Sequence, residues 1–305
     1  MIAIDLGSNT IRAVKYDCAT NTKLAEFERI VKTADKLVKT NGITDEAIER
    51  IINAVKDIKQ RFNIAENEKI KAVATEALRA AKNKEFVIEK IKNKTGIEFE
   101  VISPEEEANY TAIAVEKCLE KCDYVNYNHF LLIDIGGGST EVTVKNKDNM
   151  LSESFRLGIV TVTQRHKTPE AIKMAVKKKT KDIKNFLDFA FNTLRKPKMF
   201  VASSGTPTTI VALKLGMKYS TYDGSKINGT KITLEDLDYW AEKLMKMEMK
   251  KREELVGVGR GDLIISGIYI FKEIFKLAKY RECIVCDDGL REGVAINECE
   301  KGVKK

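Results

Sequence analysis

The sequence predicts an α/β protein that contains two copies of one domain. Strand and helix signals alternate from the first residue through residue 121, as they do in layered α/β folds. The same order of signals then restarts near residue 130. Each half opens with an apolar strand that ends in an aspartate followed by small residues, and these aspartates, Asp5 and Asp134, lie 129 positions apart. That distance is too long for a solenoid repeat and suits a duplicated domain.

The first half is expected to begin with three strands joined by short turns. The helix that follows is the clearest element, because its apolar residues recur with the 3.6-residue period and Asp45 and Glu46 lie in its first turn, where the helix dipole favours anions. The expected elements are strands 1–6, 11–16 and 24–31, helix 44–62, strand 69–75, helix 85–94, strand 97–102 and helix 105–121.

The second half repeats the three strands and then becomes richer in helices. Thr206 is expected to be the N-cap of a helix, with Pro207 at its first position, running toward Leu215. The expected elements are strands 130–135, 141–145 and 151–157, helix 169–194, strand 199–202, the helix from 207, helices 234–250 and 263–276, strand 283–286 and helix 290–299. No Pro-rich or Ser-rich linker separates the halves, so the boundary is expected near Lys121.

The composition is that of a globular protein, with 43% hydrophobic and 32% charged residues. The longest apolar run, residues 263–271, is much shorter than the roughly 20 residues needed to cross a bilayer. The N-terminus lacks the cationic region of a signal peptide. We therefore expect a soluble cytoplasmic protein that makes no use of a membrane.

The net charge of +8 and the pI near 9.0 favour an anionic partner. Aromatic residues make up only 7% of the chain and no RNA- or DNA-binding motif is present, so nucleic acid is not expected, whereas a phosphate ligand fits. The chain has only two histidines, His129 and His166. A catalytic triad based on histidine or a metal site with several histidine ligands is therefore not expected. The composition does not exclude a site that acts on phosphate with carboxylates and Mg²⁺.

The six cysteines do not have the paired spacing of a four-ligand zinc site. We interpret them as buried free thiols in a reducing compartment. They are Cys18, Cys118, Cys122, Cys283, Cys286 and Cys299.

Three loops of small residues could bind phosphate through backbone N–H groups, because small side chains let the main chain approach an anion closely. The first alone would be an ordinary tight turn. The second has more glycine than a turn needs, and the third opens a helix N-terminus. If the two halves face each other, the loops converge on one inter-domain cleft. The candidate phosphate-binding residues are Gly7, Ser8 and Asn9, then Gly136, Gly137, Gly138 and Ser139, then Gly205 and Thr206.

Five motifs, in order, resemble the signatures of the exopolyphosphatase and guanosine pentaphosphate phosphohydrolase (Ppx/GppA) family. The motifs begin at Asp5, Ala74, Ile133, Gly205 and Asp288. The resemblance implies two ribonuclease-H-like domains of the actin-like, sugar kinase and Hsp70 ATPase superfamily with an inter-domain active-site cleft, in a short form without the C-terminal helical domain. We expect domain I at 1–120 plus 290–305 and domain II at 121–289.

The resemblance also implies roles for five residues. Glu107 is the expected general base, with Glu106 as an alternative because three acids follow Pro104. Asp134 and Glu141 are the expected Mg²⁺ and water-positioning carboxylates, and Asp5 is a further metal candidate. Arg79 is the expected phosphate clamp, since a guanidinium can hold two phosphate oxygens at once.

The function implied is hydrolysis of the terminal phosphoanhydride of inorganic polyphosphate, with conversion of pppGpp to ppGpp as a related reaction. A polyphosphate- or nucleotide-dependent phosphotransferase and a non-catalytic alarmone or polyphosphate sensor are the alternatives. The lysines at 177–181 could form a track for a phosphate chain, although such charge runs are usually solvated faces. The preferred substrate, the chain length and the formation of a homodimer are left open.

Overall fold

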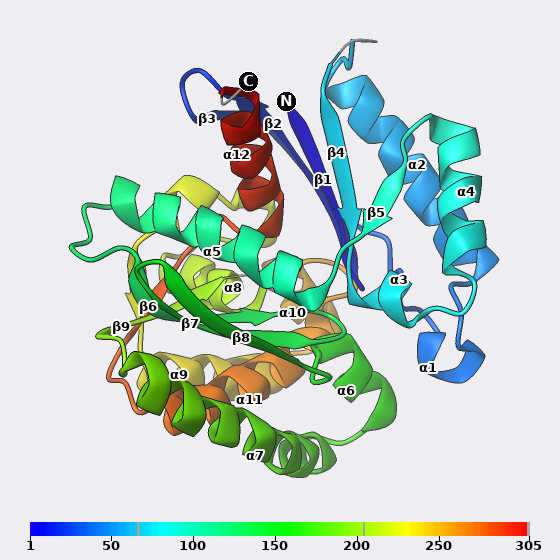
Figure 1. Ribbon diagram of the computed structural model, residues 1–305. Helices are drawn as coiled ribbons and strands as arrows, with labels where there is room; N and C mark the ends of the chain where they lie inside the picture. The colour runs from blue at the N-terminus through cyan, green and yellow to red at the C-terminus, as the bar shows by residue number, and fades with distance from the viewer. Residues whose placement is uncertain (66–67, 204, 304–305) are drawn as a thin grey trace. The chain divides into compact units, whose positions relative to one another are not determined.

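The computed structural model describes residues 1–65, 68–203 and 205–303. The chain divides into two compact units, unit 1 (Met1–Ala114 with Leu290–Lys305) and unit 2 (Val115–Gly289). Each unit contains one mixed β-sheet with helices (Figure 1), which confirms the predicted α/β class.

The sheet of unit 1 has the strand order β3-β2-β1-β4-β5. β1 pairs antiparallel with β2 and parallel with β4, so it lies in the middle of the sheet. Its residues Ile2, Ile4 and Leu6 on one face and Ala3 on the other have no exposed surface, which explains its continuous apolar sequence. The strands are β1 (Ile2–Leu6), β2 (Thr10–Asp17), β3 (Thr22–Ile30), β4 (Ile70–Ala74) and β5 (Phe99–Val101).

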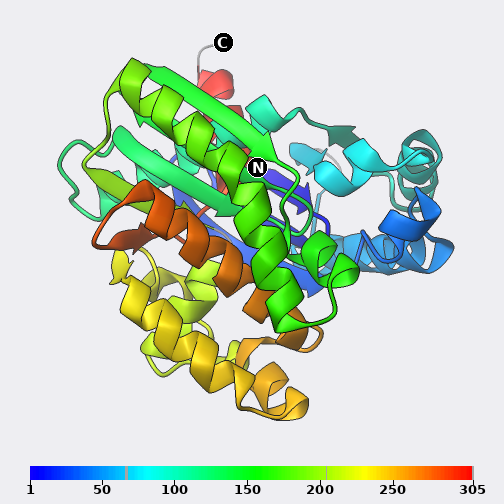
Figure 2. The ribbon, with the colours of Figure 1, turned by 90° about the horizontal axis from the view of Figure 1, so that it is seen from below.

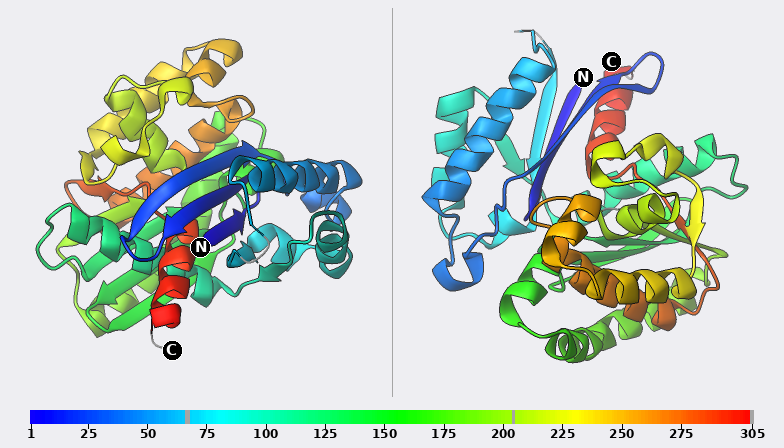
Figure 3. Two further views of the ribbon diagram at one scale, coloured as in Figure 1. Left: turned by 90° about the horizontal axis from the view of Figure 1, so that it is seen from above. Right: turned by 180° about the vertical axis from the view of Figure 1, so that it is seen from behind.

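The helices of unit 1 lie on both faces of this sheet. α12 packs against β1 and β2 (Figure 3), where its Val294 joins a core with Ala3 and Val14. α2 and α4 pack against each other, and α2 begins where Thr44 accepts a hydrogen bond from Ala47 N at 3.3 Å. The helices are α1 (Leu37–Thr40), α2 (Asp45–Arg61), α3 (Glu76–Ala80), α4 (Lys84–Thr95), the start of α5 (Pro104–Lys121) and α12 (Leu290–Val303).

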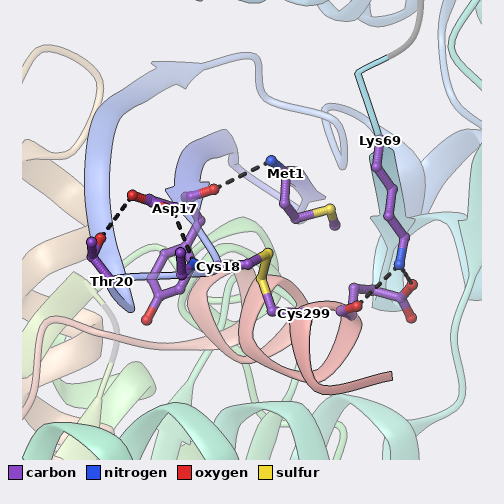
Figure 4. The surroundings of a disulfide bond; sticks show 9 residues. Met1, Asp17, Cys18, Thr20, Lys69 and Cys299 are labelled. Atoms are coloured by element: carbon purple, nitrogen blue, oxygen red, sulfur yellow. Dashed lines mark hydrogen bonds and ion pairs between the residues drawn. A yellow bond between two sulfur atoms is a disulfide. The ribbon is translucent and has the colours of Figure 1, made fainter. Parts of the chain in front are cut away.

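A disulfide between Cys18 and Cys299 ties α12 to the turn between β2 and β3 (Figure 4). The interpretation of all six cysteines as free thiols is therefore wrong for this pair. The two residues are 281 positions apart in sequence and become neighbours only because α12 returns to the first sheet. An ion pair between Lys69 and Glu298, at 2.8 Å, holds the same helix near the start of β4.

The sheet of unit 2 has the order β10-β11-β9-β6-β7-β8. β6, β7 and β8 form an antiparallel meander, and β9 pairs parallel with both β6 and β11. From β8 to β11 this is the strand order of unit 1, with β10 added at the edge, so the predicted duplication is confirmed. The strands are β6 (His129–Ile135), β7 (Thr140–Asn146), β8 (Asn149–Phe155), β9 (Met199–Ser203), β10 (Thr230–Ile232) and β11 (Cys283–Val285).

Two long helices, α7 and α11, pack side by side on one face of this second sheet (Figure 2). Phe200 of β9 packs against Phe271 and Phe275 of α11, with ring centroids 6.1 and 5.0 Å apart. The helices are α6 (Ile159–Arg165), α7 (Pro169–Leu194), α8 (Gly205–Lys214), α9 (Leu234–Met245), α10 (Met249–Val256) and α11 (Gly261–Ala278), with single 3₁₀ turns at Tyr219–Thr221 and Gly224–Lys226.

Two expected helices differ from the structure. The helix expected at 234–250 is two helices, because Arg252 of α10 folds back and donates to the carbonyl oxygens of Leu244 and Met247 at 2.8 and 3.1 Å, which ends α9. Thr206 is not an N-cap, since α8 already begins at Gly205. Pro207 is accommodated in the first turn of α8. The N–H groups of a first turn have no acceptor within the helix, so the absence of an N–H in proline breaks no helical hydrogen bond.

Among the described residues, no helix combines the length and the apolar character needed to span a bilayer.

Candidate active site

The first glycine loops of the two units have the same turn geometry. Gly7 N donates to Thr10 O at 3.0 Å, and Gly136 N donates to Ser139 O at 2.9 Å. A Cβ atom at either glycine would lie 3.3 Å from that carbonyl oxygen, which is a tight approach. The two predicted loops are therefore equivalent tight hairpin turns, each following a strand that ends near an aspartate.

In unit 2 the carbonyl groups of the glycine loop are held by the start of α6. Ile159 N donates to Gly136 O at 3.1 Å and Val160 N donates to Gly137 O at 2.8 Å. The C=O and the following N–H of a trans peptide point in opposite directions. The N–H groups of Gly137 and Gly138 therefore point away from α6, which is the orientation that an anion-binding loop requires.

Gly158 makes this contact possible, and sequence reasoning did not identify it. A Cβ atom at Gly158 would collide with Gly137 O and the carbonyl carbon of Gly138. Thr161 adds a hydrogen bond from its hydroxyl to Gly138 O at 3.4 Å. The only signal in the sequence is a glycine placed between a predicted strand and a run of β-branched residues.

In unit 1 the loop carbonyls are held in the same way by the segment after β3. Asn9 O accepts from Val31 N and Lys32 N, both at 2.9 Å, and Ser8 O accepts from Ala34 N at 2.8 Å. Main-chain hydrogen bonds thereby hold the backbone of the Ser8-Asn9 turn.

A row of polar residues crosses the sheet of unit 2 at one level. Asp134 of β6 lies opposite Glu141 of β7, and Glu141 lies opposite Ser154 of β8. Ser154 donates from its hydroxyl to Glu141 Oε1 at 2.7 Å, and Glu141 is only 4% exposed. Side chains directly opposite each other on neighbouring strands lie close together, and two like charges in that position are destabilising. A cation between Asp134 and Glu141 would remove this repulsion.

The carboxylates of Asp134 and Glu141 fit one particular mode of magnesium binding. Within the described ranges, no group of three or more His, Cys, Asp or Glu residues could hold a metal ion. Mg²⁺, however, is commonly bound through only one or two carboxylates and completes its shell with water and substrate phosphate. Hard oxygen donors on adjacent strands are suited to that mode, and a complete protein cage is not required.

Asp5 occupies the equivalent position in unit 1 but has a different neighbour. It lies opposite Arg12 of β2, and Arg12 lies opposite Glu28 of β3. Arg12 Nε donates to Glu28 at 3.0 Å. The row in unit 1 therefore places a cationic side chain where unit 2 has Glu141.

The candidate base and the candidate phosphate clamp contact each other within unit 1. Arg79 lies in the last turn of α3 and Glu107 in the first turn of α5. Arg79 donates to Glu107 Oε2 at 2.8 Å and to the carbonyl oxygen of Ile102 at 2.8 Å, and its Nε lies 3.4 Å from Glu76. These contacts fix the guanidinium, which in turn orients the Glu107 carboxylate.

Glu106 has a different role in this structure. Its carboxylate accepts from Ser103 N at 2.8 Å, and Ser103 Oγ accepts from Glu106 N at 3.1 Å. This reciprocal pair is a capping box at the start of α5. Glu106 is thus engaged at the helix end, whereas Glu107 contacts the candidate phosphate clamp Arg79.

The third loop begins α8, where Gly205 and Thr206 open the helix. Thr206 is buried, and its hydroxyl lies against Gly267 of α11, where a Cβ atom would collide with it. A phosphate contact from Thr206 would therefore come from its backbone N–H at the helix N-terminus.

The predicted residues thus form a separate set in each unit. Unit 1 brings Arg79 to Glu107 and closes the Gly7 turn two residues after Asp5. Unit 2 brings Asp134 to Glu141 beside the Gly136 loop. Sequence reasoning missed Ser154, whose isolated hydroxyl in a polar strand carries no recognisable signal.

Comparison with known proteins places this chain among phosphatases. A model of the Ppx/GppA phosphatase family matches residues 13–301. The chain is 27% identical to the bifunctional 3-dehydroquinate synthase/phosphatase of Fusobacterium nucleatum, over 89% of this chain and 42% of that protein. It is also 27% identical to exopolyphosphatase 2 of Mycobacterium tuberculosis, over 97% of each.

Two further matches are informative. The chain is 26% identical to the guanosine-5'-triphosphate,3'-diphosphate pyrophosphatase of Vibrio atlanticus, over 96% of this chain and 58% of that protein. The crystal structure of the Ppx/GppA family member of Aquifex aeolicus superposes with a TM-score of 0.72 at 28% identity, covering 99% of this chain and 97% of that one.

Proposed function

Because the chain belongs to the Ppx/GppA phosphatase family, we propose that it is an exopolyphosphatase. The reaction is hydrolysis of the terminal phosphoanhydride bond of inorganic polyphosphate, with release of orthophosphate. The relative that supports this choice is exopolyphosphatase 2 of M. tuberculosis, which is 27% identical over an alignment that covers 97% of each chain.

The proposed catalytic roles of Arg79 and Glu107 rest on the contact between their side chains. Hydrolysis of a phosphoanhydride needs a proton acceptor for the attacking water and positive charge near the phosphate oxygens. Arg79 and Glu107 supply both kinds of group, 2.8 Å apart, with side chains only 15% and 11% exposed. A base that is held by an arginine is positioned before the substrate arrives.

In this mechanism Glu107 takes a proton from the water that attacks the terminal phosphorus. Arg79 holds the carboxylate in place and attracts the terminal phosphate. In unit 2, the N–H groups of Gly137 and Gly138, directed away from α6, are the proposed donors to phosphate oxygens.

Asp134 and Glu141 are the residues proposed to hold Mg²⁺. When bound, the ion neutralises phosphate charge and polarises the bond that breaks. Ser154 keeps Glu141 in one orientation through its 2.7 Å hydrogen bond.

A second substrate, guanosine pentaphosphate (pppGpp), is proposed on the similarity to the V. atlanticus pyrophosphatase. Its terminal 5′-phosphate is joined by the same kind of phosphoanhydride bond as the end of polyphosphate. The same base and the same donors therefore serve both reactions.

The test is a comparison of orthophosphate release from tripolyphosphate, long-chain polyphosphate and pppGpp at equal concentration of terminal phosphate, with Mg²⁺ and without ADP. Release from polyphosphate supports the proposal. ATP formation on addition of ADP, with little release in its absence, would identify a phosphotransferase. Binding of pppGpp or polyphosphate without turnover would identify a sensor, and either result would overturn the proposal.

A double-mutant cycle tests whether the two sets of residues act on one substrate. Glu107→Gln and Glu141→Gln each lower kcat, and the double variant loses much less than the product of the two effects if both carboxylates serve one chemical step. Fully multiplicative losses would contradict that coupling.

A further inference from the structure

In unit 2, α11 packs against both α7 and α9 (Figure 2). Residues of these three helices line a groove of about 550 Å³. This volume falls in the range of small-ligand sites. No residue of the candidate active site lines the groove. Lys173, Met174 and Lys177 of α7 form one wall, and α11 contributes Tyr269, Lys272 and Lys276.

The carboxylates in the groove are already paired with lysines. Asp238 pairs with Lys272, and Glu273 pairs with Lys276 at 3.3 Å. Glu242 pairs with Lys246, which lies outside the groove. In the part of the chain that the structure describes, all three acidic groups that line the groove thus have a cationic partner.

Lys173 and Lys177 lack such a carboxylate. Among the ion pairs of the described residues neither takes part, and the ammonium group of Lys173 lies over the ring of Tyr269, 4.9 Å from its centroid. Burial lowers the pKa of Lys272, and the ammonium groups of Lys276 and Lys173 lower it further against the opposing effect of Glu273. Lys272 and Lys276 each have a carboxylate partner, so a bound anion would chiefly neutralise Lys173 and Lys177.

The two lysines without a carboxylate lie in one short row. Lys173 and Lys177 are one helical turn apart on α7, so their charges are about 6 Å apart along the groove. Two charges in a row along one wall suit a linear anion lying in the groove better than a single compact ion.

We propose that this groove binds a linear inorganic oligophosphate at a site separate from the candidate active site. The choice of ligand rests on the proposed function. A nucleic-acid strand suits the groove less well. Among the described residues Tyr269 is the only aromatic one that lines it, and the ammonium group of Lys173 lies over its ring, which leaves no platform for base stacking.

The lysine run 177–181 contributes only Lys177 to this site. Lys178 and Lys181 are exposed but do not line the groove. Lys179 donates to the carbonyl oxygen of Arg156 at 2.5 Å, on another part of the surface. The groove therefore draws its unpaired lysines, Lys173 and Lys177, from α7 and shares only Lys177 with the run.

The test compares two double variants that remove the same charge from the same helix. Lys173→Gln/Lys177→Gln changes the groove, and Lys178→Gln/Lys181→Gln is the matched control. Binding of long-chain polyphosphate and of tripolyphosphate is measured by calorimetry at two salt concentrations. A Glu107→Gln background limits consumption of the ligand, and orthophosphate is assayed in the same samples.

We expect the groove variant to weaken binding of long-chain polyphosphate about tenfold, since each exposed lysine contact changes affinity by a factor of about two to five. Its salt dependence should fall as well, because fewer counterions are released on binding. The control should change the affinity by less than about twofold. Equal losses in both variants, or no loss in either, would overturn the site, as would tighter binding of a single-stranded DNA oligonucleotide than of polyphosphate at the groove.

Failure of this site and failure of the proposed function give different results. The affinity difference between the two variants reports only on the groove. Orthophosphate release by the chain with an intact Glu107 reports only on hydrolysis. Equal melting temperatures for the two double variants show that the fold is intact in both.

Discussion

Replacement of Glu107 by glutamine tests the proposed general base most directly. Glutamine keeps an oxygen that can accept the hydrogen bond from Arg79, now at 2.8 Å, but it cannot take a proton from water. A hydrogen bond to a charged group contributes about 1.5 to 3 kcal/mol and a neutral one about 0.5 to 1.5 kcal/mol. The free energy of unfolding should therefore fall by only about 1 to 2 kcal/mol.

The effect on catalysis should be larger than the effect on stability. Loss of a general base lowers kcat by about 10² to 10⁴, which raises the activation free energy by about 3 to 5 kcal/mol. KM should change little, because the substitution affects the chemical step. The assay is steady-state orthophosphate release, together with thermal unfolding of the same preparation.

Glu106→Gln is the matched control, in the same turn of the same helix. A capping box accepts either glutamate or glutamine at this position, so the variant should keep its hydrogen bond to Ser103 N and both stability and kcat should stay near normal. A Glu107→Gln protein with near-normal kcat would refute the assignment. A loss of kcat in Glu106→Gln that equals the loss in Glu107→Gln would refute it equally.

Three further outcomes are expected. Gly158→Ala should lower stability by about 1 to 3 kcal/mol and raise KM, because the new methyl group displaces Gly137; thermal unfolding and kinetics check this, and an unchanged KM would contradict the role of α6 in holding the loop. Glu141→Gln should raise the Mg²⁺ concentration needed for half-maximal activity about tenfold or more, measured by metal titration, and full activity in excess chelator would exclude the Mg²⁺ assignment. Cys18→Ser with Cys299→Ser should lower the free energy of unfolding by about 2 to 4 kcal/mol under oxidising conditions; denaturant unfolding with and without a thiol reductant measures it, and equal stabilities would show that the disulfide is not formed in the folded protein.

The regular parts of the fold could be predicted because local patterns determine them. The helix expected at 44–62 is α2, Asp45–Arg61, and the helix expected at 169–194 is α7, with the same bounds. Both have an apolar stripe of helical period and a threonine cap at the first turn. The repeated strand order was also readable, since each copy opens with the same strand and turn.

Features that depend on contacts distant in sequence could not be predicted. The end of α9 is set by Arg252, which reaches back from the next helix. The disulfide needs α12 to return to the first sheet before Cys299 can meet Cys18. Gly158 is required only because α6 starts against the Gly136 loop. In each case the partner is defined by tertiary packing, and neither residue alone indicates it.

The two copies of the domain differ where the proposed chemistry requires a difference. Asp5 and Asp134 occupy equivalent strand ends, yet Asp5 faces Arg12 while Asp134 faces Glu141. A cationic side chain opposite an aspartate neutralises it and disfavours a metal ion, whereas a second carboxylate concentrates negative charge and attracts one. This difference in charge favours the sheet of unit 2 as the place for the proposed Mg²⁺. The two related sheets thus differ in charge at equivalent positions, with Arg12 and Glu28 in unit 1 where unit 2 has Glu141 and Ser154.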